Sequence, residues 1–187
     1  MDTTDWKDIQ ASLEGDGDAY KRLVRRYQSQ IARQMWRFTR DRAECERLVQ
    51  DVFVEAYFSL NRYAGRGPFV NWLSKIAVRI GYRYWKQQAK QPKTVSVINT
   101  DAVAELSESA IDPAVAAEIV HRLLGQLPQA DRLVLTLMYL EDCSTRDIAE
   151  RMGWTRAMVK MRAYRARRKL RQIAEKERLL EKLGWTR

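Results

Sequence analysis

Apolar residues recur three or four positions apart along three stretches in the first half of the chain, which is the spacing of one helix face. The stretches run from Tyr20 to Phe38, from Leu48 to Leu60 and from Phe69 to Tyr84. We interpret them as the buried faces of three amphipathic helices that short turns join into a small bundle. No stretch alternates polar and apolar residues as a β-strand does, so the pattern predicts an all-α protein.

The residues between these stripes support the predicted boundaries. Asp41 can cap the second helix, with Glu44 at the third helical position. A glycine-rich turn, Tyr63–Gly67, precedes the third helix. Pro68 then suits a first helical position, where no amide donor is needed.

The second half of the chain predicts shorter helices. A first helix spans about 114–125 and ends before Leu127-Pro128, and a second follows over about 130–138. Ser144 can cap a short helix that ends at Met152, with Asp147 in the capping-box position. Gly153 allows a tight turn, after which Thr155 can cap a last, long helix. This order predicts a helix-turn-helix.

The segment 89–112 has no helical period. Gln91-Pro92 lies near its start and Asp112-Pro113 at its end, and proline disfavours helix at the preceding residue. We interpret 89–112 as a flexible linker between two helical domains, 1–88 and 113–187. The alternative is a loop within one domain, although such long loops are uncommon in compact folds.

The charge balance points to a polyanionic partner. The chain holds 34 basic and 24 acidic side chains, with a net charge of +10 and a pI near 9.8. Nucleic acid and an acidic membrane surface are the main candidates. Residues 1–88 carry a net charge of +5, the linker −2 and residues 113–187 +7.

Several classes of protein are not expected from this composition. No apolar run approaches the roughly 20 residues of a membrane helix, and the acidic segment Met1–Asp18 is unlike a signal peptide. Two cysteines and one histidine are too few for a zinc finger or a disulfide scaffold, so we expect reduced thiols in the cytoplasm. No phosphate-binding, zinc-protease or nucleophile-elbow motif occurs. We therefore expect no enzyme activity, no cofactor and no metal.

The last predicted helix carries the strongest functional signal. Eight cations and no acid lie between positions 156 and 171. A solvated face would normally interleave Glu with Lys, so duplex DNA binding is the preferred interpretation and a solvated basic face the alternative. Its N-terminal part is expected near base edges and flanking phosphates, and Arg167, Arg168 and Arg171 near phosphates.

The third helix has a basic side of a different kind. Lys75, Arg79, Tyr82, Arg83 and Lys86 share it, Trp85 adjoins them and Asn71 begins the same side. Aromatic rings beside cations suit unstacked bases. The alternative is that Tyr82 and Trp85 complete the core. On the second helix, Gln50, Asp51 and Glu55 form either a solvated surface or a docking surface for a protein partner.

In their order and spacing these segments resemble the extracytoplasmic-function (ECF) RNA polymerase sigma factors, sigma-70 family group four. The resemblance covers about residues 14–175. It rests on Gly15–Tyr20, Leu48–Phe53, Phe69–Ala77, Leu127-Pro128, Asp147–Ala149 and Val159–Leu170.

The resemblance implies a non-enzymatic protein that binds core RNA polymerase and directs promoter recognition, strand opening and initiation. The second helix would dock on the polymerase near Gln50, Asp51 and Glu55. An anti-sigma factor would be the usual regulator, and no small-molecule substrate is implied. The alternative function is a free-standing helix-turn-helix regulator of duplex DNA.

The resemblance also implies two sets of DNA-binding residues. For the melted minus-ten strand they are Tyr63, Arg66, Phe69, Asn71, Lys75, Arg79, Tyr82, Arg83 and Lys86. For the minus-thirty-five duplex they are Thr155, Arg156, Lys160, Met161, Arg162, Tyr164, Arg165 and Arg168. Arg79 stands where many relatives have Asn, and Met161 where Ser is common, so both base preferences are expected to be unusual.

Overall fold

The computed structural model describes residues 3–90 and 113–176. Within these ranges every regular element is a helix, which confirms the all-α prediction. The chain divides into two compact units, residues 1–88 and residues 89–187. The predicted linker lies almost entirely outside the described residues, as does the tail beyond position 176.

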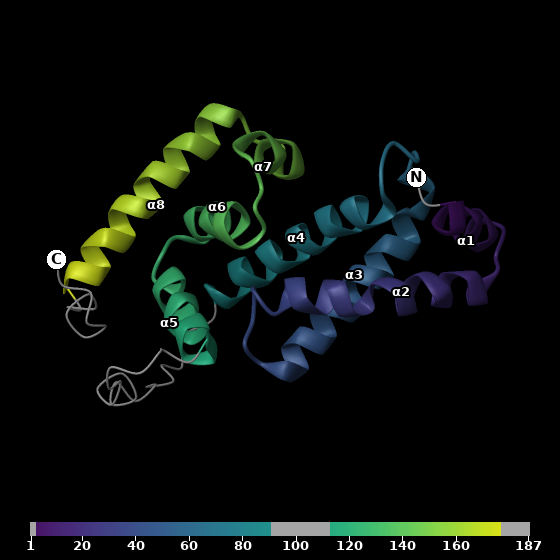
Figure 1. Cartoon of the computed structure of the whole chain (residues 1–187), viewed down its shortest axis with the longest axis horizontal. Coiled ribbons are helices and arrows are strands. Elements are labelled where there is room, and N and C mark those ends of the chain that lie inside the picture. Colours follow the sequence, from purple (N-terminus) through teal and green to yellow (C-terminus); the bar gives the residue numbers. More distant parts are fainter. Residues whose placement is uncertain (1–2, 91–112, 177–187) are drawn as a thin grey trace. The chain divides into compact units, whose positions relative to one another are not determined.

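The first unit contains α1 (Thr3–Leu13), α2 (Gly17–Met35), α3 (Arg42–Ser59), the short 3₁₀ helix η1 (Leu60–Arg62) and α4 (Phe69–Gln88) (Figure 1). The helices α2, α3 and α4 pack on one another. They bury the three predicted apolar stripes between them. Fully buried members of this core are Leu23, Ile31, Met35, Leu48, Val52 and Leu73.

Local signals position these helices. The Asp41 carboxylate accepts a hydrogen bond from the Glu44 amide at 2.8 Å, as predicted. Gly65 and Gly67 have φ angles of 68° and 151° in the loop before α4, a backbone region that favours glycine. Helix α4 begins at Phe69, so Pro68 precedes its first residue instead of occupying it.

Helix α1, like the short η1, was not predicted by the sequence analysis. It packs along α2, where its two carboxylates Asp5 and Asp8 are buried. Arg26 bonds both carboxylates, at 2.5 Å to Asp5 and 2.9 Å to Asp8, and Arg22 bonds Asp8 at 2.8 Å. Burial alone would raise the pKa of Asp8, but the hydrogen bonds and charges of the two arginines outweigh it and lower that pKa.

A close contact joins α4 to the segment after α2. The Phe38 ring lies against Gly81, where an added Cβ would fall 2.4 Å from ring carbons. The Trp85 indole N–H donates to the Phe38 carbonyl at 2.7 Å. Because Phe38 packs on this side, α4 is buried over a wider arc than its apolar stripe suggests.

The second unit contains α5 (Pro113–Gly125), α6 (Gln129–Leu140), α7 (Thr145–Met152) and α8 (Arg156–Lys176). Helix α8 packs against α5, α6 and α7. Their shared core includes Leu133, Leu137, Ile148 and Val159, each fully buried.

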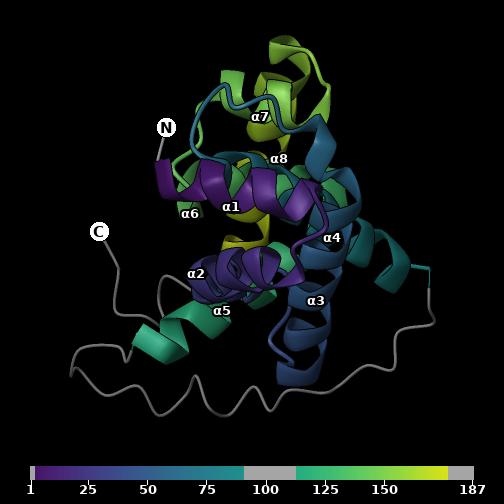
Figure 2. The same ribbon diagram turned by 90° about the vertical axis from the view of Figure 1, so that its right-hand side faces the viewer.

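The helix-turn-helix is formed by α7 and α8 (Figures 1 and 2). Ser144 and Asp147 make the predicted capping box, and the Ser144 hydrogen bonds lower the pKa of the Asp147 carboxyl. Gly153 ends α7 in the left-handed conformation, with φ of 67°. The Thr155 hydroxyl then accepts a hydrogen bond from the Met158 amide at 3.2 Å, which caps α8. All three local signals were predicted from the sequence.

Candidate nucleic-acid and polymerase interfaces

One side of α8 is fixed in the core and the other projects from the unit. Val159, Ala163, Ala166 and Ile173 are buried against the neighbouring helices. The opposite side carries exposed residues that we call the α8 face. The α8 face consists of Lys160, Met161, Tyr164, Arg165 and Arg168.

The cations of the α8 face have no carboxylate beside them. Among the residues that the structure describes, no ion pair is formed by Lys160, Arg165 or Arg168. On the same helix Arg167 contacts the Tyr139 hydroxyl at 3.4 Å, a neutral partner. The face therefore concentrates positive charge that nothing within the described unit offsets.

Arg162 departs from the prediction that it contacts DNA. Its guanidinium bonds Asp131 of α6 at 3.2 Å and lies 4.9 Å from the Trp154 ring centroid. Only 25% of its side chain is exposed. Arg162 lies on the flank of α8 that turns toward α6, so in this structure it holds the unit together. Thr155 and Arg156 remain exposed at the start of the helix.

Helix α4 presents a second basic surface. The α4 face consists of Lys75, Arg79, Tyr82, Arg83 and Lys86, and its four cations are exposed. The Lys86 ammonium lies 4.8 Å from the centroid of the half-buried Tyr82 ring. Arg66 and Asn71 are exposed in the preceding loop and the first turn. Aromatic and cationic groups thus lie together, as predicted.

Three aromatic residues that the sequence analysis associated with the minus-ten strand are buried in the core. The exposed fractions are 1% for Phe69, 4% for Trp85 and 9% for Tyr63. Tyr63 packs against Phe69, with ring centroids 5.4 Å apart, and its hydroxyl donates to the Gly67 carbonyl. These residues shape the loop before α4 and fasten α4 to the bundle. Phe69 was already the first residue of a predicted buried stripe, and core packing was the alternative given for Trp85, whereas the burial of Tyr63 was not predicted.

Trp72 is a ring that the sequence analysis assigned to the core but the structure leaves half-buried. It contacts Tyr63 and Phe69 on one side, at centroid distances of 5.6 and 5.5 Å. Lys75 and Arg79 follow it at three and seven positions, on the same side of the helix. Trp72 therefore extends the α4 face toward the loop.

The polar residues of α3 lie beside exposed apolar ones. Gln50 and Asp51 are exposed, and Asp51 pairs with Arg47 of the same helix at 2.9 Å. Val54 and Phe58 follow on the same helix, one turn apart, and their side chains are 55% and 79% exposed. We call Gln50, Asp51, Val54 and Phe58 the α3 patch. Glu55, also predicted here, pairs across to Arg83 of α4 at 2.5 Å.

Two family models match the chain, one in each unit. The model described as Sigma-70 region 2 matches residues 23–91, and that described as Sigma-70, region 4 matches residues 117–170. The "ECF RNA polymerase sigma-E factor" of Escherichia coli K12 is 30% identical over 174 residues, which cover 88% of this chain and 91% of that protein. The chain belongs to the ECF sigma factors.

Solved structures share the fold of this ECF sigma factor. The structure of CnrH in complex with the cytosolic domain of CnrY superposes with a TM-score of 0.62 at 22% identity, over 92% of this chain and 97% of that one. The sigma factor RpoE of Bartonella quintana, solved in complex with the anti-sigma factor NepR, gives 0.56 at 16% identity, over 83% and 96%. The family resemblance seen in the sequence is confirmed.

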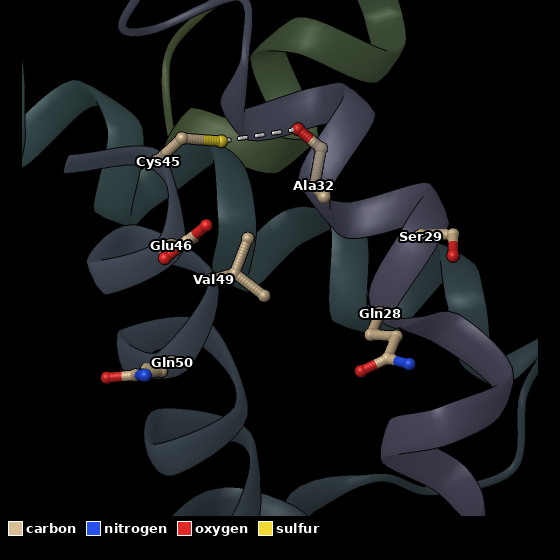
Figure 3. A pocket seen from close by; sticks show the side chains of 7 residues that line it. All are labelled: Gln28, Ser29, Ala32, Cys45, Glu46, Val49 and Gln50. Atoms are coloured by element: carbon tan, nitrogen blue, oxygen red, sulfur yellow. Dashed lines mark hydrogen bonds between the residues drawn. The ribbon is translucent and has the colours of Figure 1, made fainter. Parts of the chain in front are cut away.

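The sigma factor also has a pocket between α2 and α3 (Figure 3). It has a volume of about 470 Å³ and borders the α3 patch at Gln50. Cys45 lies in its wall and donates its thiol hydrogen to the Ala32 carbonyl at 3.7 Å. Burial raises the pKa of this thiol, which keeps it protonated.

Across residues 3–90 and 113–176, no group of acidic, His or Cys side chains is arranged to hold a metal ion, and no helix is suited to cross a membrane.

Proposed function

We propose that this ECF sigma factor binds core RNA polymerase and directs it to promoters, where the α8 face reads the minus-thirty-five duplex and the α4 face holds the opened minus-ten strand. The protein acts by placing the polymerase and the DNA, so it catalyses no reaction and uses no cofactor or small-molecule substrate. Since the chromosome and the polymerase lie in the cytoplasm, we expect it to act there.

The observation that carries this proposal is the chemical difference between the two basic faces. The α8 face is a projecting helix side behind a capped turn, with cations that lack carboxylate partners, which suits the major groove of a duplex. The α4 face combines cations with the Tyr82 and Trp72 rings, which suits unstacked bases along a backbone. A protein that binds only duplex DNA needs the first face but not the second.

At the minus-ten element we assign different tasks to the residues of the α4 face. Lys75, Arg83 and Lys86 follow the phosphates, because they are exposed cations on one side of the helix. Tyr82 and Trp72 stack on bases. Arg79 lies between the two rings along the helix and is placed to contact a base edge. Arg66 and Asn71 extend the surface at the loop.

At the minus-thirty-five element we assign the N-terminal half of α8 to the groove. Lys160, Met161, Tyr164 and Arg165 contact bases, and Arg168 contacts a phosphate further along. Thr155 and Arg156 lie at the start of the helix, where flanking phosphates approach. Arg162 is left out of the set because Asp131 and Trp154 hold it inside the unit.

For core polymerase we propose the α3 patch as the docking surface. Val54 and Phe58 give it an apolar centre and Gln50 and Asp51 a polar rim, the composition typical of protein interfaces. Val54 and Phe58 lie one turn apart on α3, so their exposed side chains adjoin, and adjoining exposed apolar groups are a feature of interaction sites. We further propose that an anti-sigma factor regulates the protein, as NepR binds RpoE of Bartonella quintana.

The test is reconstituted transcription with purified core polymerase and a promoter library. We expect defined start sites only when this protein is added. A Phe58→Ala variant should lose affinity for core polymerase, and a Leu13→Ala variant, which removes another exposed apolar side chain outside the α3 patch, should not.

The outcome that would favour the free-standing regulator is equally definite. In that case the protein alone would protect a duplex operator, and core polymerase with the protein would start at no defined site. Phe58→Ala would then have no effect on DNA binding or on transcription.

A further inference from the structure

Three large apolar side chains interrupt the cationic surface of the recognition helix α8. Met158, Met161 and Tyr164 are 43%, 56% and 58% exposed. They are spaced by three residues, so they form one stripe across the side of the helix away from the buried Val159 and Ala163. We call these three residues the apolar stripe. It lies in the half of α8 that is expected to enter the groove.

The surroundings of the apolar stripe restrict what can cover it. Lys160, Arg165 and Arg168 flank it, and no acid occurs between positions 156 and 171. A basic protein surface would be repelled, and an apolar groove in a protein would have to bury these cations without partners. The partner must therefore combine negative charge at the sides with apolar groups in the middle.

Duplex DNA offers this combination in one place. Phosphates line the two edges of the major groove, and the C5-methyl group of thymine is the apolar group on its floor. Thioether side chains are unbranched and adapt to irregular apolar surfaces. A phenol ring can contact a methyl group with its face while its hydroxyl stays in water.

We propose that the apolar stripe reads thymine methyl groups, so that the minus-thirty-five element of this sigma factor contains thymines at the positions facing Met158, Met161 and Tyr164. This inference rests on the proposed function and adds the class of base pair selected. Met161 is the central reader because it lies in the middle of the apolar stripe and is 56% exposed. The flanking cations supply affinity and one or more guanine contacts, while the stripe supplies the preference for A·T pairs.

The test uses the full-length protein with core polymerase. Promoters are first selected from a library randomised at the minus-thirty-five element, and we expect thymine to be enriched where α8 contacts the duplex. Each enriched thymine is then replaced by deoxyuridine, which differs only by the missing methyl group. Holoenzyme affinity should fall about fourfold for each contacted methyl, the size expected for one buried methyl group.

Variants identify the side chain that makes each contact. Met161→Gln keeps the length of the side chain but not its apolar end, so we expect it to abolish the deoxyuridine penalty at one position. Met161→Leu should preserve the penalty. Arg168→Ala is the matched control on the same face, because loss of a phosphate contact weakens thymine and deoxyuridine duplexes equally. Thermal melting followed by circular dichroism verifies that each variant is folded.

The proposal is overturned if the selected elements show no thymine enrichment, or if the wild-type holoenzyme binds deoxyuridine and thymine duplexes equally well. It is also overturned if the penalty survives Met158→Gln, Met161→Gln and Tyr164→Ala alike, because some other group then reads the methyl. Capture of the stripe by an acidic protein, with no effect of the three variants on promoter choice, is a further contradictory outcome. Absence of any defined start site is a different result, which refutes the proposed function itself and the inference with it.

Discussion

The two units have similar excesses of positive charge but arrange them differently. In the first unit, acidic side chains lie beside many of the cations: Asp5 and Asp8 hold Arg26, and Glu55 holds Arg83 of the α4 face. In the second unit, Arg162 is the α8 cation that pairs with a carboxylate among the described residues, and it is turned toward α6. The α8 face has none.

Net charge therefore does not predict which kind of nucleic acid a surface binds. Residues 1–88 and 113–187 carry +5 and +7, which does not separate their roles. What separates the two basic faces is that Arg83 of the α4 face has a carboxylate partner and rings lie among its other cations, whereas no cation of the α8 face is paired within the part of the chain that the structure describes. Cations without such partners form a long, uniform field suited to a duplex, whereas partly paired cations beside rings suit a strand whose bases are held one by one.

The largest expected effect concerns Trp85, for which the sequence analysis left open a place beside the DNA or in the core, and which the structure places in the core. Trp85→Ala should lower the free energy of unfolding of the first unit by about 3–5 kcal/mol, since a buried indole and its hydrogen bond to Phe38 are lost. Hydrogen exchange resolved by residue measures this separately for each unit. The matched control is Trp36→Ala, whose side chain is 38% exposed, and we expect a much smaller change. A loss for Trp85→Ala as small as that expected for Trp36→Ala would place Trp85 on the surface.

The case of Trp85 shows where sequence reasoning reaches its limit. Caps such as Asp41 and Ser144 were predictable because both partners lie within three residues of each other. The position of Trp85 was not, because it depends on Phe38 packing against Gly81, a contact between residues 43 positions apart. The spacing of apolar residues alone does not tell whether a helix is buried on one side or on two.

Helix α1 was missed for a related reason. It lies in the acidic segment for which no helix was predicted, and carboxylates are rarely buried unless they are paired. The partners of Asp8 are Arg22 and Arg26, on the following helix, and no local pattern connects them. The spacing of Trp6, Ile9 and Leu13 was the available signal for a helix here. On α3, Val54 and Phe58 were missed because they lie off the apolar stripe and are exposed.

The second prediction uses acid to separate the two units. Asp8→Asn should destabilise the first unit by about 2 kcal/mol at neutral pH, because charged hydrogen bonds to Arg22 and Arg26 are weakened. The folded-state pKa of Asp8 is lowered, so its contribution is present above the unfolded value of about 3.9 and is lost as the pH falls through the folded value. Melting curves of wild type and variant should therefore begin to converge below about pH 4 and coincide once the pH has fallen below the folded value. A difference that persisted there would contradict the ionic role of Asp8.

The third prediction tests whether the α8 face reads bases. Arg165→Ala should weaken promoter use by about 1–3 kcal/mol and relax the preference at one position if Arg165 contacts a guanine. Holoenzyme binding to a set of singly substituted minus-thirty-five duplexes measures this. An equal loss on every duplex, accompanied by a shallower salt dependence, would instead assign Arg165 to a phosphate.

The fourth prediction tests the α4 face on opened DNA. Tyr82→Ala should weaken capture of the minus-ten strand by about 1–3 kcal/mol, the value of one stacked base, and should leave binding to the minus-thirty-five duplex unchanged. Permanganate reactivity of unpaired thymines at the promoter reports the opening. Tyr82→Phe, which retains the ring, should restore it. Normal opening by Tyr82→Ala would assign the ring to packing with Lys86 alone.

The smallest effect is expected at the ion pair that joins the α3 and α4 surfaces. The Glu55 and Arg83 side chains are 38% and 59% exposed, and exposed pairs contribute at most about 1 kcal/mol. Glu55→Gln should therefore leave the stability of the first unit nearly unchanged. It should, however, release Arg83, and binding of the minus-ten strand should become more sensitive to salt by about one phosphate contact. If the salt dependence is unaltered while polymerase affinity falls, Glu55 acts as part of the docking surface and the pairing with Arg83 does not limit DNA binding.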